Sequence, residues 1–458
     1  MSNMSRRTFM KNAILMSAGM TTLSSVLVPK MRAATSDEDL SSFLLLMPYL
    51  GKPTHASITM NLVAGDKDII CYAKYRMNDQ SPAKPWHRTK DIHLDAFSAV
   101  DLQLTGLRPG TRYQYELYAC LGDGKDFQKV IGETFITQKS DPAAFSFAVF
   151  SDAHITPFDK DRSEILTQTS ASVLSRRPDF TFMLGDNIQT FTSHGGPMTE
   201  PRFGPILYAQ LRHGMGPLPS AVPVFKVLGN WEGENGWHPA RERSWAREAR
   251  MAFIPNPGAE TYPEGGNEDE DYYAFTWGDV LFVALNVTGY TLSDHTMQSP
   301  VGKPDDWTLG DKQKAWLFET LSESKAKWKL LFIHHTVGGN AGDDVNSRYG
   351  RGGGRAAKTG EQALIHRWMQ QFSVQALFYG HDHVFTDIPV DGIHYICVGS
   401  AGAPWKFPTS VTGYEKYWTP SGYTWVDVEK DRLKITFLEP DPVVPEGKVM
   451  HRFDIVSK

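Results

Sequence analysis

Cysteine is scarce in this sequence, and so are long apolar runs and an excess of positive charge. Three cysteines among 458 residues cannot form a disulfide framework, which excludes the small disulfide-stapled folds. No stretch reaches the about 18 consecutive apolar residues of a membrane-spanning helix, so we expect no membrane span. Acidic residues outnumber basic ones by 52 to 47, whereas binding to a nucleic-acid backbone requires the opposite balance. What remains is an ordinary globular composition, with 41% hydrophobic and 22% charged residues.

Positive charge is concentrated at the amino terminus, where the first 34 residues contain five basic residues and no acidic one. Arg6 and Arg7 are consecutive, and residues 13–28 form a weakly apolar run. This pattern resembles a twin-arginine export signal covering residues 1–34, with cleavage near Ala34. The alternative is a basic amphipathic first helix of the mature fold. The resemblance predicts a periplasmic or secreted protein that is exported after it has folded.

Residues 40–139 have the pattern of a small all-β domain. A Pro109-Gly110 turn just before Tyr113 resembles the tyrosine corner of fibronectin type III domains. We therefore expect a fibronectin type III-like sandwich, which either packs as a scaffold against the following region or binds a substrate or a surface. Runs that alternate apolar and polar residues lie at 55–62, 69–75 and 113–120.

The three cysteines leave two alternatives open. Cys71 and Cys120 lie in separate predicted strands of the β-domain, where they either pair in an oxidising compartment or stay as two buried thiols. Cys397 has no partner in either case.

From residue 145 onward, short apolar runs end abruptly in residues of the types that bind metals. Such runs are typical of buried strands, and the stretches at 165–173 and 364–369 between them have helical periodicity. Strands that alternate with helices indicate an α/β fold, in which ligands gather at the carboxyl ends of the strands. The runs and the residues that follow them are 145–150 with Asp152 and His154, 180–184 with Asp186, 224–228 with Asn230, 329–333 with His334, and 376–379 with His381 and His383.

Together these strand ends resemble the motif series D-x-H, G-D, G-N-H-E/D, H and G-H-x-H of the calcineurin-like metallophosphoesterase superfamily. The resemblance implies that residues 143–458 form an α/β domain, a four-layer β-sandwich flanked by helices. A preceding fibronectin-like domain is similar to that of the purple acid phosphatases. Those enzymes have a tyrosine where this chain has Gln189 and lack the histidine of Asp152-Ala153-His154, so we expect the Asp-x-His branch without a charge-transfer tyrosine.

The resemblance also implies a dinuclear metal centre with one shared carboxylate, which by motif position is Asp186. Carboxylate and imidazole ligands without a thiolate suit two divalent or trivalent ions such as Fe, Mn, Zn or Co. A metal-bridging hydroxide is then the nucleophile, and the expected reaction is hydrolysis of a small-molecule phosphate monoester or diester. The implied ligands are Asp152, His154 and His383 for the first metal, and Asn230, His334 and His381 for the second.

One position departs from the family pattern, because the third motif reads Gly229-Asn230-Trp231 where a histidine is usual. That histidine commonly binds the phosphate and helps to protonate the leaving group, whereas tryptophan donates one N–H but transfers no proton. Three alternatives follow. Another histidine, His194 or His335, protonates the leaving group instead, or the leaving group departs with little protonation. In the third alternative the protein has lost catalysis. His335 is otherwise expected to contact the substrate or to support a ligand.

Further residues outside the motifs have two interpretations each. Arg351 lies in a glycine-rich loop and either grips phosphate or belongs to a solvated surface loop. The acidic run 268–271 is expected to be a solvated turn, and His213 and His238 are expected to lie in loops and face solvent. Core packing is favoured over pocket lining for Trp237, Trp277, Trp307 and Trp405.

Two alternatives to a phosphoesterase follow from the same residues. The loss of the histidine at Trp231 permits a catalytically impaired protein that only binds metal or phosphate. The β-domain permits a surface-binding protein in which the fibronectin-like region carries the function.

Overall fold

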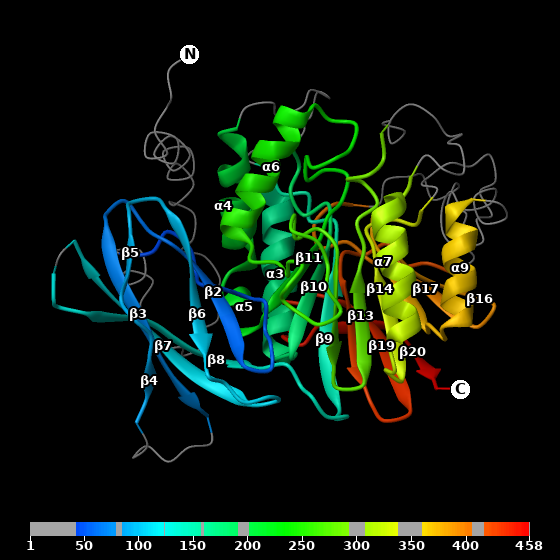
Figure 1. Cartoon of the computed structure of the whole chain (residues 1–458), viewed down its shortest axis with the longest axis horizontal. Coiled ribbons are helices and arrows are strands. Elements are labelled where there is room, and N and C mark those ends of the chain that lie inside the picture. Colours follow the sequence, from blue (N-terminus) through cyan, green and yellow to red (C-terminus); the bar gives the residue numbers. More distant parts are fainter. Residues whose placement is uncertain are drawn as a thin grey trace.

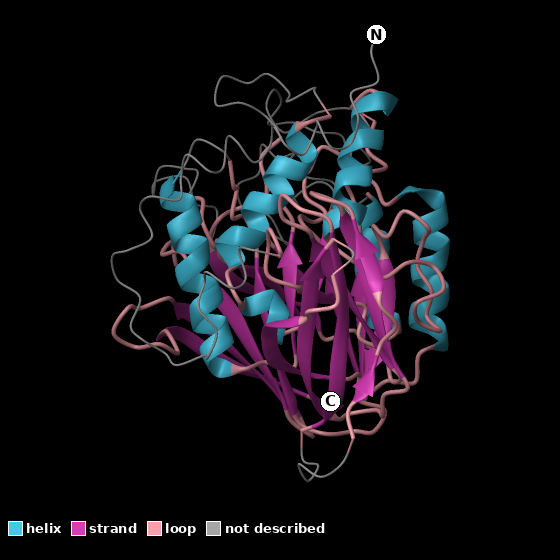
Figure 2. Ribbon diagram, turned by 90° about the vertical axis from the view of Figure 1, so that its left-hand side faces the viewer, coloured by secondary structure: helices cyan, strands magenta, loops and turns pink. Residues whose placement is uncertain are grey.

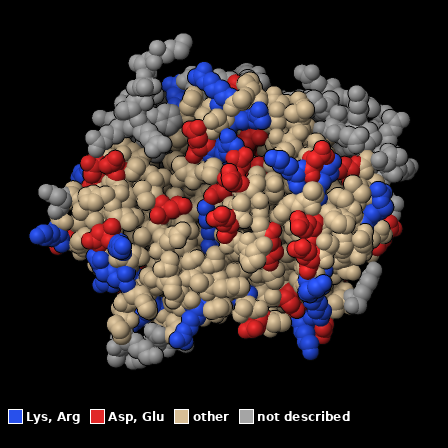
Figure 3. Space-filling view, viewed as in Figure 1, with Lys and Arg blue, Asp and Glu red and all other residues tan. Residues whose placement is uncertain are grey.

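The structure is a computed structural model that describes residues 43–78, 85–122, 124–156, 160–190, 201–292, 307–337, 360–404 and 416–457 (Figure 1). The predicted export signal lies outside these residues, so it stays a prediction. None of the described helices combines the length and the apolarity that a bilayer crossing requires. On the face shown in Figure 3, basic and acidic side chains are interspersed, and no basic stripe of the kind that binds nucleic acids stands out.

The amino-terminal region is all-β and consists of two sheets (Figure 1). One sheet has the order β1-β2-β6, and the other has the order β4-β3-β7-β8, with β5 paired to β3. The Tyr113 hydroxyl accepts a hydrogen bond of 3.0 Å from the Arg108 backbone N–H, which is the contact expected of a tyrosine corner. The assignment to the fibronectin type III class and the domain boundaries remain predictions. The strands are β1 Tyr49–Gly51, β2 Ser57–Val63, β3 Ile69–Met77, β4 His87–Arg88, β5 Ile92–Leu94, β6 Ala99–Thr105, β7 Arg112–Leu121 and β8 Gln128–Ile136.

Strand register decides between the two alternatives for the cysteines. Cys71 pairs with Ala119, and Cys120 pairs with Ile70, so the two cysteines occupy adjacent positions of the β3–β7 ladder. Side chains alternate between faces along a strand, which places the two thiols on opposite sides of the sheet. Both are buried and free, as is Cys397, so the structure holds thiols rather than a disulfide.

Two six-stranded sheets form the second region. The five predicted ligand-bearing strands are all present, shifted by at most one residue at their ends. Among them, β9, β10 and β11 pair in parallel in one sheet, and β14 and β15 pair in parallel in the other. One sheet has the order β11-β10-β9-β18-β19-β20 and the other β12-β13-β14-β15-β17-β16. The strands are β9 Phe145–Phe150, β10 Phe180–Leu184, β11 Val224–Val227, β12 Tyr273–Trp277, β13 Val280–Ala284, β14 Trp328–Phe332, β15 Ala376–Tyr379, β16 Phe385–Val390, β17 Ile393–Val398, β18 Tyr423–Val428, β19 Arg432–Glu439 and β20 Lys448–Val456.

The two sheets pack face to face through an aromatic core and are covered by helices on both outer faces (Figure 2). Phe182 of the first sheet stacks on Phe332 of the second, with ring centroids 4.2 Å apart. Apolar residues of α3 and α4 cover the first sheet, and those of α7 and α9 cover the second. This four-layer α/β arrangement confirms the predicted fold class. The helices are α3 Lys160–Arg176, α4 Phe203–Met215, α5 Leu218–Ala221, α6 Ala240–Phe253, α7 Gly310–Glu323 and α9 Glu361–Gln371.

Buried polar contacts join the all-β region to the α/β region. The Arg212 guanidinium of α4 is fully buried and donates to Asn61 Oδ1 at 2.6 Å and to the Met47 carbonyl at 2.6 Å. Burial lowers the pKa of Arg212 to about 9. Tyr115 of β7 donates to the Ser220 carbonyl at 2.7 Å. The two regions therefore share an interior in this structure.

Two expectations for loops were wrong in part. The acidic run 268–271 is not a solvated turn, because Glu270 forms an ion pair of 2.6 Å with Lys52 and Asp271 is buried. His213 lies in α4 rather than in a loop, although it does face solvent. Trp277 and Trp307 are buried in the core, as expected, and Trp405 lies outside the described residues.

Candidate metal centre

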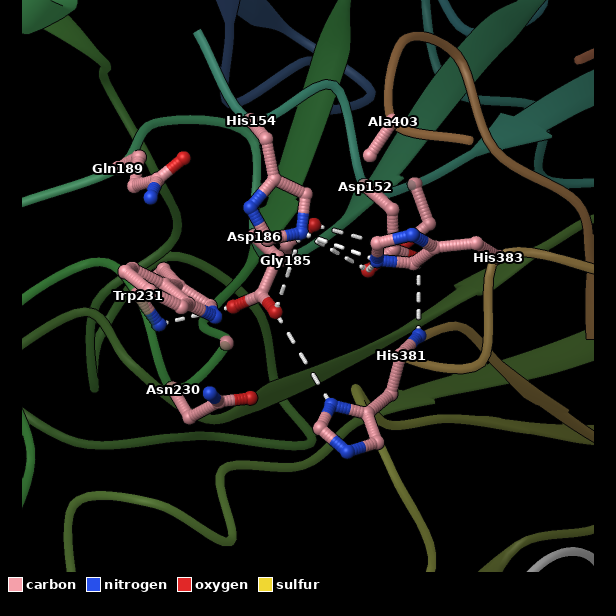
Figure 4. Close-up of polar contacts among 12 residues, drawn as sticks. Asp152, His154, Gly185, Asp186, Gln189, Asn230, Trp231, His381, His383 and Ala403 are labelled. Carbon is pink, nitrogen blue, oxygen red and sulfur yellow. Dashed lines mark hydrogen bonds and ion pairs between the residues drawn. The ribbon is translucent and has the colours of Figure 1, made fainter. Parts of the chain in front are cut away.

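The predicted ligands come together in two buried clusters at the carboxyl ends of the strands (Figure 4). One cluster contains Asp152, His154 and His383, and the other contains Asp186, His334 and His381. Within each cluster the potential ligand atoms lie within 4.8 Å of one another. The two groups correspond to the division that the sequence motifs imply.

The first cluster joins the loop after β9 to the loop after β15. His154 Nε2 and His383 Nε2 are 3.1 Å apart. Asp152 Oδ1 is buried, lies 3.4 Å from His383 Nε2 and 3.7 Å from His154 Nε2, and makes no hydrogen bond within the described part of the chain. A carboxylate oxygen and two imidazole nitrogens thus face a common point.

The second cluster draws on the loops after β10, β11, β14 and β15. Asp186 Oδ2 lies 3.0 Å from His334 Nε2 and 4.0 Å from His381 Nδ1. The end of the Asn230 side-chain amide lies 3.2 Å from His334 Nε2, so an amide oxygen at this end would face the same point. Asp186 Oδ2 is also 3.6 Å from His154 Nε2 of the first cluster. Asp186 therefore lies between the two clusters, where a shared carboxylate is expected.

Hydrogen bonds to the main chain set the orientation of two imidazole rings. His334 Nδ1 lies 2.7 Å from the Leu184 carbonyl, and His383 Nδ1 lies 2.7 Å from the Pro404 carbonyl. Each Nδ1 lies where its N–H can donate to the carbonyl, which directs Nε2 into the cluster as the atom that would bind a metal.

The ligand-bearing loops adopt a backbone conformation that L-residues rarely use. Five of the candidate ligands have a positive φ, which for side chains other than glycine costs free energy and persists only where the surroundings enforce it. Two of the bonds that enforce it run from the Asp152 N–H to the Gly185 carbonyl at 3.0 Å and from the His154 N–H to the Asp186 carbonyl at 2.8 Å. The φ values are 56° at Asp152, 48° at His154, 48° at Asp186, 72° at His381 and 56° at His383.

The carboxylates and imidazoles of the centre shift one another's ionisation. Burial alone would raise the pKa of Asp152, but the charges of His383 and other nearby histidines hold it well below its ordinary value. Burial opposes protonation of His334, yet the Asp186 carboxylate raises its pKa to about 9. The acidic groups are therefore ionised, and they favour a cation at this position.

The arrangement fits the chemistry of a bound metal. The two clusters offer carboxylate oxygens and imidazole nitrogens, with the Asn230 amide beside them and no thiolate, which suits Zn, Mn, Fe or Co. The buried Asp152 Oδ1 and the facing Nε2 atoms of His154 and His383 are potential ligand atoms that a bound cation would satisfy.

Trp231, the residue that replaces the usual histidine, borders both clusters (Figure 4). Its backbone N–H donates to Asp186 Oδ1 at 2.8 Å, and its ring lies edge-on to His154 with centroids 5.7 Å apart. Gln189 is half-buried and accepts a hydrogen bond of 2.8 Å from Arg162.

Of the predicted catalytic donors, only His335 lies in the described part of the chain besides Trp231. Its ring is buried and packs edge-on against Trp307 at 4.4 Å. Burial and the charge of His334 lower the pKa of His335 to about 3, so the ring is neutral near pH 7 and acts as a hydrogen-bonding group. His194 and Arg351 lie outside the described residues, and their roles stay predictions.

The buried ion pair of Lys226 and Glu232 was not predicted from the sequence motifs. It contacts Asp186, whose backbone N–H donates to Glu232 Oε2. Both side chains are 0% exposed, and Lys226 Nζ is 2.7 Å from Glu232 Oε1. The available signal was a lysine inside an otherwise apolar strand, six residues before an acidic residue in the third motif.

Comparisons with known proteins agree with the site. The family model described as calcineurin-like phosphoesterase matches residues 145–385. The chain is similar to purple acid phosphatase PPD1 from yellow lupin seeds, with a TM-score of 0.66, 16% identity, and 89% of this chain and 74% of that chain covered. It is also similar to PhoD, with a TM-score of 0.69, 14% identity, and 93% and 92% covered. At such low identity these two likenesses show a shared fold only. No curated protein sequence gives a significant match.

Proposed function

The chain belongs to the calcineurin-like phosphoesterase family, and on this basis we propose that it hydrolyses small-molecule phosphate esters with two metal ions. The observation that carries the proposal is the position of Asp186 Oδ2, which lies 3.0 Å from His334 Nε2 in one cluster and 3.6 Å from His154 Nε2 in the other. One carboxylate that serves two buried donor groups is what a dinuclear site requires.

The seven predicted ligands have distinct roles in this proposal. Bound metals would supply Lewis acidity toward the phosphoryl oxygens and lower the pKa of a coordinated water so that it attacks phosphorus. Asp186 would offset the charge of both ions, and the Nε2 atoms of His334 and His383, oriented by the main chain, would bind the metals in place of a proton. First-metal ligands are Asp152, His154 and His383, and second-metal ligands are Asn230, His334 and His381.

Leaving-group chemistry narrows the proposed substrate. Of the candidate proton donors in the described part of the chain, Trp231 cannot transfer a proton near neutral pH, and His335 is neutral and buried. We therefore propose esters whose leaving group is weakly basic, such as aryl monoesters or activated diesters, over alkyl monoesters.

The test combines metal analysis with a substrate panel. Purified protein is assayed with para-nitrophenyl phosphate, bis-para-nitrophenyl phosphate and an alkyl monoester, after loading with Mn²⁺, Zn²⁺ or Fe²⁺. We expect two ions per chain and faster turnover of the aryl substrates. Protein that binds no metal, or that hydrolyses none of the three, contradicts the proposal.

Trp231 also favours a second candidate, a protein that binds metal and phosphate without hydrolysis. Two bound ions and measurable inorganic phosphate binding without turnover on any ester of the panel would support this candidate over the first.

We further propose export through the twin-arginine pathway, supported by Arg6 and Arg7 in a basic, acid-free amino terminus. Replacing both by Lys should leave folded precursor in the cytoplasm. Unchanged periplasmic protein in the double variant would contradict this assignment.

A further inference from the structure

A single carboxylate holds together the two loops that carry Asp186 and Asn230. Glu232 Oε2 accepts the backbone N–H groups of Asp186 and Gly229, each at 2.9 Å. Its second oxygen, Oε1, accepts the Asn187 N–H at 2.9 Å and the Lys226 ammonium at 2.7 Å. Both oxygens are thus satisfied by groups from the ends of β10 and β11.

The loops that Glu232 joins lie in direct contact. A Cβ added at Gly229 would lie 2.4 Å from both Asp186 N and Asp186 Oδ1, and one at Gly185 would lie 2.5 Å from Gly229 N and 2.8 Å from His334 Nδ1. Only glycine permits this approach. A small displacement of either loop therefore changes the separation between Asp186 and Asn230.

Lys226 is fixed as firmly as its partner. Its N–H donates to Asn256 Oδ1 at 2.9 Å, and its carbonyl accepts from Asn256 Nδ2 at 2.8 Å and from the Tyr273 hydroxyl at 3.1 Å. The ammonium is 0% exposed. A buried charge without a partner is strongly unfavourable, so Lys226 and Glu232 must be kept or lost together.

We propose that Glu232 is a positioning residue that sets the geometry of the second metal cluster, with Lys226 as its charge partner. The hydrogen bonds of the carboxylate go to backbone N–H groups and to Lys226. It therefore acts on the ligands through the backbone of Asp186 and of Gly229, the residue before Asn230. This inference rests on the proposed function, because it assigns a role toward the metals of that site.

The test separates positioning from stability with two variants. Glu232→Gln keeps the shape of the side chain but leaves Lys226 charged and unpaired, whereas Glu232→Gln with Lys226→Met removes both charges. We expect the single variant to melt at a lower temperature and to bind the second metal about 10–100-fold more weakly, the range typical when a group supporting a ligand is lost. The double variant should regain most of the melting temperature but not the metal affinity.

The measurements are thermal melting of the metal-free full chain and calorimetric titration with Mn²⁺ alone. Titration in a His383→Ala background isolates the second cluster, since it removes a ligand of the first. Glu361→Gln is the matched control, because Glu361 is a buried carboxylate that accepts the Leu309 N–H at 2.7 Å and pairs with Lys314 at 3.0 Å, neither of which is a candidate ligand. The control should leave Mn²⁺ affinity unchanged.

Two results would overturn the inference: Mn²⁺ affinity that recovers with melting temperature in the double variant, or affinity that Glu232→Gln does not alter. Wild-type protein that binds two ions but hydrolyses no ester contradicts only the proposed function, since the affinities still decide the role of Glu232. Wild-type protein that binds no metal contradicts both.

Discussion

The two candidate metal clusters meet at Asp186 but rest on different supports. The first, around Asp152, is supported by neutral groups: the Ala403 N–H and the Ser400 hydroxyl donate to the Asp152 carbonyl, each at 3.0 Å. The half-exposed Arg162 also contacts it and donates to the His154 carbonyl at 3.2 Å. The second cluster is backed by the fully buried pair of Glu232 and Lys226.

This difference predicts how each cluster responds to substitutions outside its ligands. Removing one partner of a buried neutral hydrogen bond costs about 1–3 kcal/mol, which is less than the cost at a charged group. A buried charge pair fails as a unit when one partner is removed, because the other stays charged and unpaired. The second cluster should therefore be the more sensitive one to substitutions outside its ligands.

The largest effect is expected at the residue that the clusters share. Asp186→Asn removes the negative charge between two cations, so bound metal should fall toward one ion per chain and turnover by several orders of magnitude. Metal analysis and steady-state kinetics measure the two outcomes. A variant that keeps two ions and a near wild-type rate would refute the shared-carboxylate assignment.

Removing one ligand from each cluster should separate them. His383→Ala should cost the first ion and leave the second, and His334→Ala should do the reverse, so each variant binds about one ion per chain. Mn²⁺ titration with elemental analysis measures the stoichiometry, and circular dichroism of the metal-free variants controls for folding. Loss of both ions in both variants would show that the clusters do not bind independently.

Substitution of Trp231 tests whether hydrolysis is limited by the lack of a proton donor at this position. Trp231→His places an ionisable ring beside His154 and should speed hydrolysis of an alkyl monoester by about 10²-fold, the lower end for general acid catalysis, with little effect on an aryl ester. Rates on both esters are compared at constant metal content, with His335→Ala alongside. If His335→Ala selectively slows the alkyl ester and Trp231→His brings no gain, His335 already donates the proton.

The smallest effect concerns Asp271, a buried carboxyl near the Arg250–Glu234 pair. Burial raises the pKa of Asp271 from 3.8 to about 6, so the folded protein binds this proton more tightly than the unfolded chain. The contribution of Asp271 to the free energy of unfolding therefore falls as pH rises from about 4 to about 6, by on the order of 2–3 kcal/mol.

Urea unfolding at pH 4 and pH 7 measures this effect in the wild type and in Asp271→Asn. Comparing the two pH values cancels any change in hydrogen bonding that the substitution itself causes. The variant should gain about 2–3 kcal/mol on the wild type between pH 4 and pH 7. An equal difference at both pH values would show that the carboxyl does not titrate in this window.

The fold class and the ligand clusters followed from the sequence because their signals are local. Apolar runs such as 145–150 end directly at ligand residues, and parallel strands bring those ends to one edge of a sheet. The Lys226–Glu232 pair was missed because charged residues normally indicate solvent, and burial is permitted here only by a partner that tertiary structure supplies. The expectation of a solvated turn at Glu270 was wrong for the same reason, because its partner Lys52 lies far away in the chain.

Register and backbone conformation were also beyond the sequence. A shift of one residue in the register of β3 against β7 decides whether Cys71 and Cys120 lie on the same face of the sheet. The alternating sequence pattern alone does not fix this register. A positive φ at Asp152 or His383 cannot be recognised as it can at glycine, because these residue types occur in every conformation.

The left-handed conformation of five ligand residues has a consequence for how the protein acquires its ions. Hydrogen bonds within the polypeptide, such as that from the His154 N–H to the Asp186 carbonyl, help to hold these loops in that conformation. Because these bonds involve only protein groups, they restrict the backbone of the loops in the same way whichever ion is bound. Since affinity at nitrogen and oxygen sites follows the general order of the divalent ions, the supply of metal at loading should decide which ion is found there. Exchange of one ion for another should change the rate while the loops keep their shape.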